Sequence, residues 1–338
     1  MAAGKSVFLI GPGFIGHNIV DILTSEGYNV TALTRRESQA DVLSKSGVTP
    51  VLGSLTDSSL ITEYVAKSDI TYQCASGDNL PLLEATLAGI RQRAKADKPT
   101  TYIHTSGAKI LCDNVRGMHK SDKTYSDLDP AGIDSVPDDA PHRHVDTAIV
   151  QAQRELKDHL KAAIMMPPEV YGYDSKQDRL SMTVPRMTRF ALNHGYPPMI
   201  GRGEAIDTAV HVHDQARGYV EVLHHLESMN QGSATENLYW FCEDGHEFTY
   251  RDLADTIGKA LHERGRIADP TPREPPEALF GELSGANTLA YAGSNCRGYS
   301  DRLRSLGWTA REKGIWQSYL EDELPVILKA YDEQKQKQ

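Results

Sequence analysis

The stretch FLIGPGFIGHNIV at residues 8–20 constrains the fold more than any other part of the sequence. An apolar run ends in three glycines, Gly11, Gly13 and Gly16, and a helical pattern begins at once. In this spacing the first glycine permits a tight turn after a strand, the second lets the backbone approach a pyrophosphate, and the third lets the helix pack on the sheet. Unpaired N–H groups at the start of that helix attract phosphates. The stretch therefore predicts a dinucleotide-binding loop.

Short apolar runs alternate with helical patterns through the first 165 residues, which predicts an α/β fold with a Rossmann-type doubly wound parallel sheet. The expected strands are 7–10, 29–33, 49–52, 70–74, 101–104 and 162–165, and the expected helices are 14–25, 37–45, 57–66, 80–96 and 147–159. Such sheets bind ligands beyond the carboxyl ends of their strands. We therefore expect the functional residues in the loops that follow each strand.

After residue 172 the alternation weakens, which indicates a smaller C-terminal lobe on the substrate side. We predict a nucleotide-binding domain over 1–170, to which 207–228 returns, and a substrate lobe formed by 171–206 and 229–338. The lobe is expected to end in a helix interrupted at Pro325. The polar segment 112–144 is unusually long for a loop, and we expect it to border the active-site cleft.

Composition excludes several classes of function. A formal net charge of -10 argues against binding to nucleic acid, which requires clustered Lys and Arg. No apolar run approaches the ~20 residues of a membrane helix, so we expect a cytoplasmic protein without a membrane partner. His211 and His213 share one face of an expected strand, but the sequence supplies no evident third ligand, and we predict no metal site.

The end of the second expected strand reads VTALTRRES, and it bears on which dinucleotide binds. A carboxylate here would hold the ribose 2′-hydroxyl of NAD. The sequence instead places Thr34, Arg35 and Arg36 there, with no carboxylate before Glu37. Guanidinium groups match the geometry of a phosphate, so the pair favours NADP(H), with NAD(H) as the alternative.

In this order, the motifs resemble the short-chain dehydrogenase/reductase superfamily, in the extended and atypical branch related to NAD-dependent epimerases and dehydratases. Further stretches that carry the resemblance are GSLTD at 53–57, IHTSGA at 103–108, MMPPEVYG at 165–172, VHVHDQARGYVEVL at 210–223 and SNCRGYSDRLRSLGW at 294–308. With the glycine loop and the arginine pair, the resemblance implies these cofactor-binding residues: Gly11, Gly13, Phe14, Ile15, Gly16, Thr34, Arg35, Arg36, Ser54, Leu55, Ala75, Ser76, Thr105, Pro168 and Val170.

The resemblance also implies a catalytic Tyr with a Lys four residues later, on one face of a helix. Only Tyr331 and Lys335 have this spacing, and they lie in the polar C-terminal tail. On the helix expected to carry the pair, Thr147 and Gln151 stand at the two positions. A Thr hydroxyl without a neighbouring Lys cannot act as an equivalent acid or base. The usual catalytic pattern is therefore missing.

Other groups are candidates for the missing chemistry. The resemblance places Ser106 beside the nicotinamide, where its hydroxyl can orient a substrate oxygen. His144 lies three residues before Thr147, and imidazoles exchange protons near neutral pH. Tyr171, in the loop after the sixth strand, is a further candidate, although a half-buried Tyr more often packs with its hydroxyl bonded to the backbone.

We therefore predict an enzyme that uses NADP(H) to act on a carbonyl, hydroxyl or enolisable centre of a small organic substrate of specialised metabolism. Ser106 would orient the substrate and His144 would supply the proton, while the cofactor carries the difficult chemistry. Two alternatives remain at this point: a redox-neutral isomerase, lyase or cyclase with a structural nucleotide, and a non-catalytic NADP-binding sensor. Assembly as a homodimer also remains open.

Overall fold

The structure is a computed structural model that describes residues 4–230 and 236–337. Its central sheet has seven strands in the order β12-β7-β5-β4-β1-β2-β3, and all neighbouring strands are parallel. The strands are β1 (Ser6–Ile10), β2 (Asn29–Thr34), β3 (Thr49–Leu52), β4 (Ile70–Gln73), β5 (Thr100–Thr105), β7 (Leu160–Met166) and β12 (Tyr239–Phe241). The strand order reverses between β1 and β4, which is where such sheets bind their ligands.

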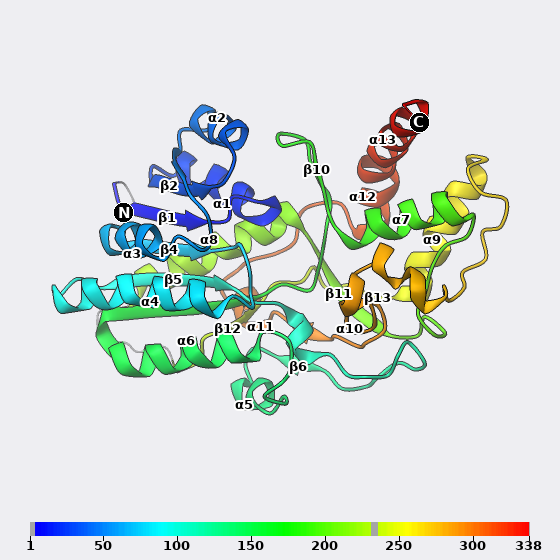
Figure 1. The fold of residues 1–338 in the computed structure, drawn as a ribbon. Helices are drawn as coiled ribbons and strands as arrows, with labels where there is room; N and C mark the ends of the chain where they lie inside the picture. Colours follow the sequence, from blue (N-terminus) through cyan, green and yellow to red (C-terminus); the bar gives the residue numbers. More distant parts are fainter. Residues whose placement is uncertain (1–3, 231–235, 338) are drawn as a thin grey trace.

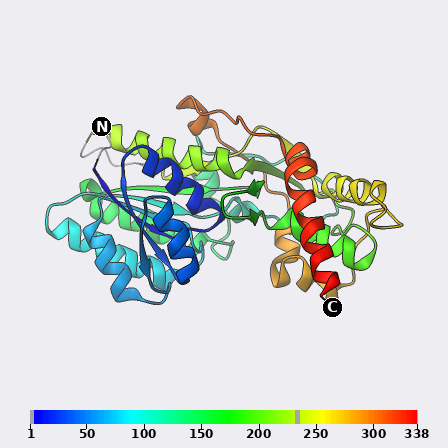
Figure 2. The same cartoon turned by 90° about the horizontal axis from the view of Figure 1, so that it is seen from above.

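Helices cover both faces of this sheet (Figures 1 and 2). One face carries α1 (Phe14–Ser25), α2 (Glu37–Lys45) and α8 (Val212–Ser228), and the other carries α3 (Ser58–Lys67), α4 (Leu80–Lys95) and α6 (Arg143–Leu156). Residues of β1 alternate between the two cores, with Leu9 in one and Phe8 in the other. This layering is the expected doubly wound α/β fold, which is confirmed.

A second lobe has its own core around Phe190, Ile257 and Tyr319. Its helices are α7 (Thr183–His194), α9 (Tyr250–Glu263), α10 (Thr288–Ala292), α12 (Ile315–Ser318) and α13 (Leu324–Gln336). Its strands are β8 (Glu169–Tyr171), β9 (Tyr173–Asp174), β10 (Arg179–Leu180), β11 (Ile206–His211) and β13 (Glu247–Thr249). In Figure 1 this lobe lies beyond the end of the central sheet to which β1 points.

Short elements complete the fold. They are β6 (Tyr125–Ser126), α5 (Pro130–Asp134), β14 (Gly298–Tyr299), α11 (Asp301–Ser305), the 3-10 turns Ala108–Leu111, Lys157–His159, Glu277–Glu282 and Gly285–Asn287, and a π-helical turn at Tyr319–Glu323. Throughout the two described ranges, each helix is too short or too polar to cross a lipid bilayer.

Two expectations about the elements need correction. The helix expected at 147–159 begins at Arg143, because His142 has a φ of 67° and turns the chain into the helix four residues earlier. Residues 239–241, assigned above to the lobe, form the seventh strand of the central sheet. All three are buried, as in a strand that is covered on both faces. The final helix is interrupted at Pro325, as expected: α12, the π-helical turn at Tyr319–Glu323 and α13 follow one another without a gap, and the π-helical turn ends two residues before Pro325, which has no N–H to donate.

Candidate functional site

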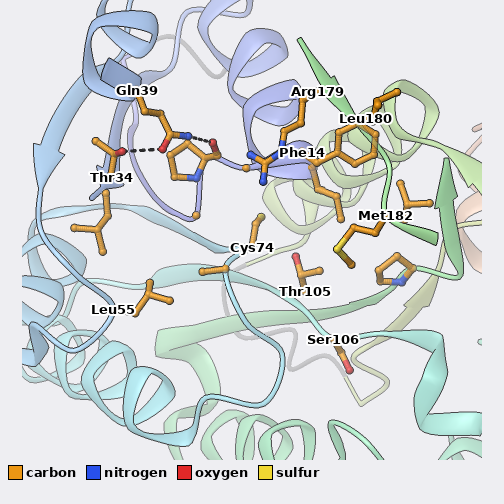
Figure 3. A pocket seen from close by; sticks show the side chains of 18 of the residues that line it. Phe14, Thr34, Gln39, Leu55, Cys74, Thr105, Ser106, Arg179, Leu180 and Met182 are labelled. Atoms are coloured by element: carbon orange, nitrogen blue, oxygen red, sulfur yellow. Dashed lines mark hydrogen bonds between the residues drawn. The ribbon is translucent and has the colours of Figure 1, made fainter. Parts of the chain in front are cut away.

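A cavity of about 520 Å³ lies along the carboxyl ends of β1, β2, β4, β5 and β7 and continues into the second lobe (Figure 3). Its lining from the sheet comes from the loops at 11–15, 33–36, 74–75, 105–109 and 167–170, as expected from the strand pattern. Residues of the lobe, among them Arg179, Met182 and Tyr291, close the other side. The cavity therefore lies between the two parts of the molecule, where a dinucleotide and a substrate can meet.

The glycine loop is folded too tightly for side chains at two positions. Gly11 has a φ of 94°, and a Cβ there would lie 2.7 Å from the backbone of Ala75. A Cβ at Gly16 would lie 2.2 Å from the carbonyl oxygen of Gly11. No side chain in the described ranges caps the start of α1 at Gly13, so its first N–H groups face the cavity unpaired. These features fit a dinucleotide pyrophosphate.

Arg35 and Arg36 follow β2 and line the cavity with exposed side chains. The neighbouring Thr34 is buried, and its hydroxyl donates to Gln39 Oε1 at 2.9 Å. Gln39 in turn donates its amide to the carbonyl of Pro12 in the glycine loop (Figure 3). The end of β2 is thus tied to the glycine loop, so the arginines and the loop line neighbouring parts of the same cavity.

Arg179 is a cavity residue that the sequence did not indicate. It lies on the β9–β10 hairpin, and its guanidinium Nη1 is 3.5 Å from the place that a Cβ on Gly13 would take. The hairpin is held on α1 by a 3.2 Å hydrogen bond from Asn18 Nδ2 to Asp174 Oδ2. Burial, together with the nearby Arg36, lowers the pKa of Arg179. An anion at the glycine loop would relieve this repulsion between guanidinium groups.

Most of the residues expected to bind the cofactor do line the cavity. They are Gly11, Gly13, Phe14, Ile15, Thr34, Arg35, Arg36, Leu55, Ala75, Thr105, Pro168 and Val170. The lining, which is drawn from the described residues, does not include Gly16, Ser54 or Ser76. Gly16 packs behind the loop, the hydroxyl of Ser54 is 2.7 Å from that of Thr56, and the carbonyl of Ser76 accepts a hydrogen bond from Gln73.

Thr105 and Ser106, at the end of β5, line the middle of the cavity. The hydroxyl of Thr105 accepts a hydrogen bond from Tyr219 at 3.0 Å. Ser106 is buried except for its cavity face, and its Oγ lies 2.7 Å from Oδ2 of Asp146, a fully buried carboxyl on α6. Burial raises the pKa of Asp146 to about 7. The structure thus places a carboxyl behind Ser106.

Thr147 and Gln151 do not reach the cavity. Both side chains are exposed on the outer face of α6, where Gln151 Nε2 lies 3.5 Å from Glu155. The helix register presents Asp146 to the sheet, and the next residue consequently points outward. The structure does not support a catalytic role for Thr147 or Gln151.

The two other proposed acids also lie away from the cavity lining, as far as the described chain defines it. His144 is exposed, and its Nε2 is 3.2 Å from the carbonyl of Asp78. Tyr171 is buried, and its hydroxyl oxygen lies 2.8 Å from Asp244 Oδ2 and 3.0 Å from the carbonyl of Lys313, two acceptors within reach of its one hydrogen. Tyr171 therefore takes the packing role that was the alternative in the sequence. Ser106 is left as the one proposed catalytic residue at the cavity.

Two titratable residues at the lobe end of the cavity were also missed by the sequence. Glu169 accepts a 2.8 Å hydrogen bond from Thr183, and burial raises its pKa to about 7. The ammonium of Lys109 donates to Asp207 and to the carbonyl of Tyr291, so its charge is already paired within the protein. Glu169 lies within the stretch MMPPEVYG, but its surroundings and those of Lys109 are assembled from segments far apart in the chain, which no local motif shows.

The segment 112–144 does not border the cavity, contrary to expectation. None of its residues, all of them described, belongs to the lining. Residues 113–119 instead pack against the second lobe, where the N–H of Gly117 donates to the carbonyl of Gly293 at 2.7 Å, and residues 125–134 lie at the β12 edge of the sheet. The buried Asp127 accepts hydrogen bonds from the backbone N–H groups of Phe241 at 3.1 Å and Arg302 at 2.9 Å. The segment therefore runs from the second lobe to this edge of the sheet.

The His211–His213 pair has a third neighbour that the sequence could not show. Ligand atoms of His211, His213 and Glu312 lie within 4.8 Å of one another. However, Arg217 donates to Glu312 at 3.2 Å, and Nδ1 of His211 accepts the backbone N–H of His213 at the start of α8. A guanidinium beside the carboxylate disfavours a cation, and we assign no metal here.

Comparison with known proteins agrees with this geometry. Residues 11–130 match the family model described as NAD(P)H-binding, and residues 134–236 match that of the NAD dependent epimerase/dehydratase family. Oxidase ucsJ of Acremonium sp is 26% identical over 78% of this chain and 80% of its own length. A sterol-4-alpha-carboxylate 3-dehydrogenase, decarboxylating, from Dictyostelium discoideum is 47% identical, but over only 21% of this chain and 22% of its own.

Solved structures share the fold over nearly the whole chain. UDP-glucose 4-epimerase of Thermotoga maritima, solved with UDP-glucose, has a TM-score of 0.66 at 15% identity and covers 96% of this chain and 99% of its own. Yeast methylglyoxal/isovaleraldehyde reductase Gre2, solved with NADPH, has a TM-score of 0.61 at 17% identity and covers 96% of this chain and 98% of its own. At these identities the likeness shows the fold alone.

Proposed function

This chain belongs to the NAD(P)-binding proteins of the epimerase/dehydratase families, and we propose that it is an NADP(H)-dependent oxidoreductase acting on a small organic substrate. The observation that carries the proposal is one continuous cavity. Arg35 and Arg36 lie at its nucleotide end and Ser106 lies at its middle, next to the opening into the lobe. A cofactor held at the glycine loop would extend from the two arginines to Ser106.

Different residues of the cavity would bind different parts of the cofactor and the substrate. The glycine loop and α1 would hold the pyrophosphate, Arg35 and Arg36 the 2′-phosphate, and Thr105 and Pro168 the nicotinamide end. A bound NADPH would supply hydride. Ser106 would hold the carbonyl or hydroxyl oxygen of the substrate.

The lobe end of the cavity suits an apolar substrate. Phe14, Leu180 and Met182 line it (Figure 3), and the ammonium of Lys109 is paired with Asp207. A sugar nucleotide carries a diphosphate that requires unpaired cationic groups. The lining therefore favours an apolar ketone or secondary alcohol over a sugar nucleotide. The partial match to a sterol dehydrogenase supports the same class of substrate.

The proposal is tested by nucleotide binding and turnover. We expect NADPH to bind more tightly than NADH in a fluorescence titration. We also expect the purified protein to consume NADPH with at least one of methylglyoxal, isovaleraldehyde and an apolar steroid ketone. Tight NADPH binding without consumption across the panel would contradict the oxidoreductase and favour a redox-neutral reaction. Failure to bind either nucleotide would contradict the assignment of the cavity itself.

Arg179 provides a separate test of the pyrophosphate position. Because its guanidinium lies over Gly13, we expect Arg179→Ala to weaken NADPH and NADH alike, by about ten-fold, as for the loss of one charge-assisted hydrogen bond. Lys329→Ala, which removes an exposed charge from α13, is the control. A loss confined to NADPH would place Arg179 at the 2′-phosphate instead.

A further inference from the structure

A row of buried polar side chains runs from Ser106 into the sheet. Ser106 Oγ is 2.7 Å from Asp146 Oδ2, and Asp146 Oδ1 faces His104 Nε2 at 3.9 Å. His104 Nδ1 is 3.2 Å from the hydroxyl of Tyr102, which donates to Gln73 Oε1 at 2.8 Å. All five residues are buried, and in the described lining Ser106 alone among them reaches the cavity.

The hydrogen bonds of this row fix the state of His104. The single hydrogen of the Tyr102 hydroxyl goes to Gln73, so the Nδ1–H of His104 must donate to the Tyr102 oxygen. Nε2 then carries a lone pair. Burial lowers the pKa of His104 to about 3, so the ring is neutral. His104 consequently offers Asp146 neither a positive charge nor a hydrogen to bind.

Asp146 is left in surroundings that do not suit a carboxylate. It is fully buried, and within the described chain its Oδ1 has no hydrogen-bond partner. The groups that act on it from the surrounding elements are Ser106, His104 and Tyr102 on β5 and its end, Asp78 after β4, His142 and Arg143 at the start of α6, and Tyr239 on β12. The effect of burial on the pKa of Asp146 outweighs the interactions that favour its carboxylate form, because an incompletely paired carboxylate is costly in the interior.

We propose that Asp146 is the proton store of the reaction and exchanges its proton with the substrate through Ser106. As a carboxylate, Asp146 accepts the hydrogen of Ser106, and the hydroxyl turns away from Thr105 and Met182, as Figure 3 shows. As a neutral acid, Asp146 donates across the same 2.7 Å contact instead. The hydrogen of Ser106 is then free to bind a substrate oxygen in the cavity.

The inference rests on the proposed oxidoreductase function, and the reduction step balances. NADPH held at the glycine loop would supply a hydride to the carbonyl carbon of the substrate, and the C=O π pair would move to the oxygen. That oxygen takes the hydrogen of Ser106, Ser106 takes the proton of Asp146, and Asp146 becomes a carboxylate. After the alcohol leaves, Asp146 regains a proton from water through Ser106. Alcohol oxidation runs in reverse and needs the carboxylate form.

The first test observes the proton store without any turnover. In protein labelled with ¹³C at the aspartate carboxyls, we expect one resonance to titrate near pH 7 and to vanish in Asp146→Asn. Ser106→Ala should retain this titration. Asn is isosteric with Asp, and NADPH affinity within about three-fold of wild type would show that the site is still folded. An Asp146 resonance that stays that of a carboxylate at every pH where the protein is folded would overturn the proposal.

The second test uses the panel compound that the wild-type protein reduces. Reduction needs the neutral acid, so kcat should fall as pH rises through about 7, and the reverse oxidation should rise over the same range. Asp146→Asn should lower kcat about 100- to 10,000-fold, the range for loss of general acid catalysis, without this pH dependence. Ser106→Ala should have a similar effect, and Ser106→Thr should restore part of the rate because it keeps a hydroxyl.

Glu169 is the matched comparison, because it is a carboxyl of the cavity lining whose pKa, like that of Asp146, is raised by burial to about 7. We expect Glu169→Gln to keep the fall of kcat with pH. If Glu169→Gln loses this fall and Asp146→Asn keeps it, the proton relay is overturned while the oxidoreductase stands. If the wild-type protein binds NADPH and reduces nothing in the panel, the oxidoreductase itself fails, and the carboxyl titration still decides the state of Asp146.

Discussion

Replacing Arg35 and Arg36 together by Ala is expected to reduce the affinity for NADPH at least about 100-fold and to leave the affinity for NADH within about three-fold. Each charge-assisted hydrogen bond contributes about 1.5 to 3 kcal/mol, and two such bonds to a 2′-phosphate account for the difference. Both side chains line the cavity beside Thr34, and no carboxylate stands at the end of β2 to bind a ribose hydroxyl.

Fluorescence titration with both nucleotides measures this effect. Lys45→Ala is a suitable control, since it removes an exposed charge from α2, the helix that follows the two arginines, without approaching the cavity. An equal loss of NADPH and NADH affinity would contradict the assignment of these arginines to the 2′-phosphate. It would indicate general electrostatic attraction of the nucleotide instead.

Gly16→Ala is expected to abolish nucleotide binding and to lower the free energy of unfolding by about 1 to 3 kcal/mol, the usual effect of overpacking. The added methyl group would lie 2.2 Å from the carbonyl oxygen of Gly11. Because that atom belongs to the backbone of the loop, either the loop or α1 must move. The N–H groups that face the pyrophosphate would then lose their alignment.

Thermal unfolding and the same titrations measure both consequences. Gly314→Ala is the matched control, because no atom lies within 4 Å of its added Cβ and its φ of -63° suits any residue. Wild-type affinity in Gly16→Ala would show that the glycine loop does not hold the nucleotide.

The sequence indicated the nucleotide half of the site because that half is local. Gly11, Gly13 and Gly16 act within one turn of chain, and Arg35 and Arg36 follow directly from the end of a strand. A sequence pattern predicts the three-dimensional arrangement well when the strand and the helix that form the site follow one another directly in the chain. The same holds for the central sheet, whose first six strands lie within two residues of the expected bounds.

The catalytic half of the site could not be predicted from local sequence patterns. Which residue of α6 faces Ser106 depends on where the helix starts, and a left-handed residue, His142, sets that start at Arg143. If α6 began at a different residue, Thr147 instead of Asp146 would face the sheet. Arg179 depends on a hairpin with strands of two residues, too short to leave a periodic pattern. These residues are brought together by long-range packing, which a local pattern does not encode.

The position of β12 has a consequence for the way the chain is made. β12 completes the sheet beside β7, and Leu303 and Trp308 complete the core beneath α8, although most of the lobe's chain is interleaved with these segments. A ribosome that has released the first 230 residues has therefore produced a nucleotide domain with an open edge and an unfilled core. We expect a chain ended at that point to aggregate, because an uncovered edge strand pairs with other chains. Both parts of the molecule must reach their native state late in synthesis and together.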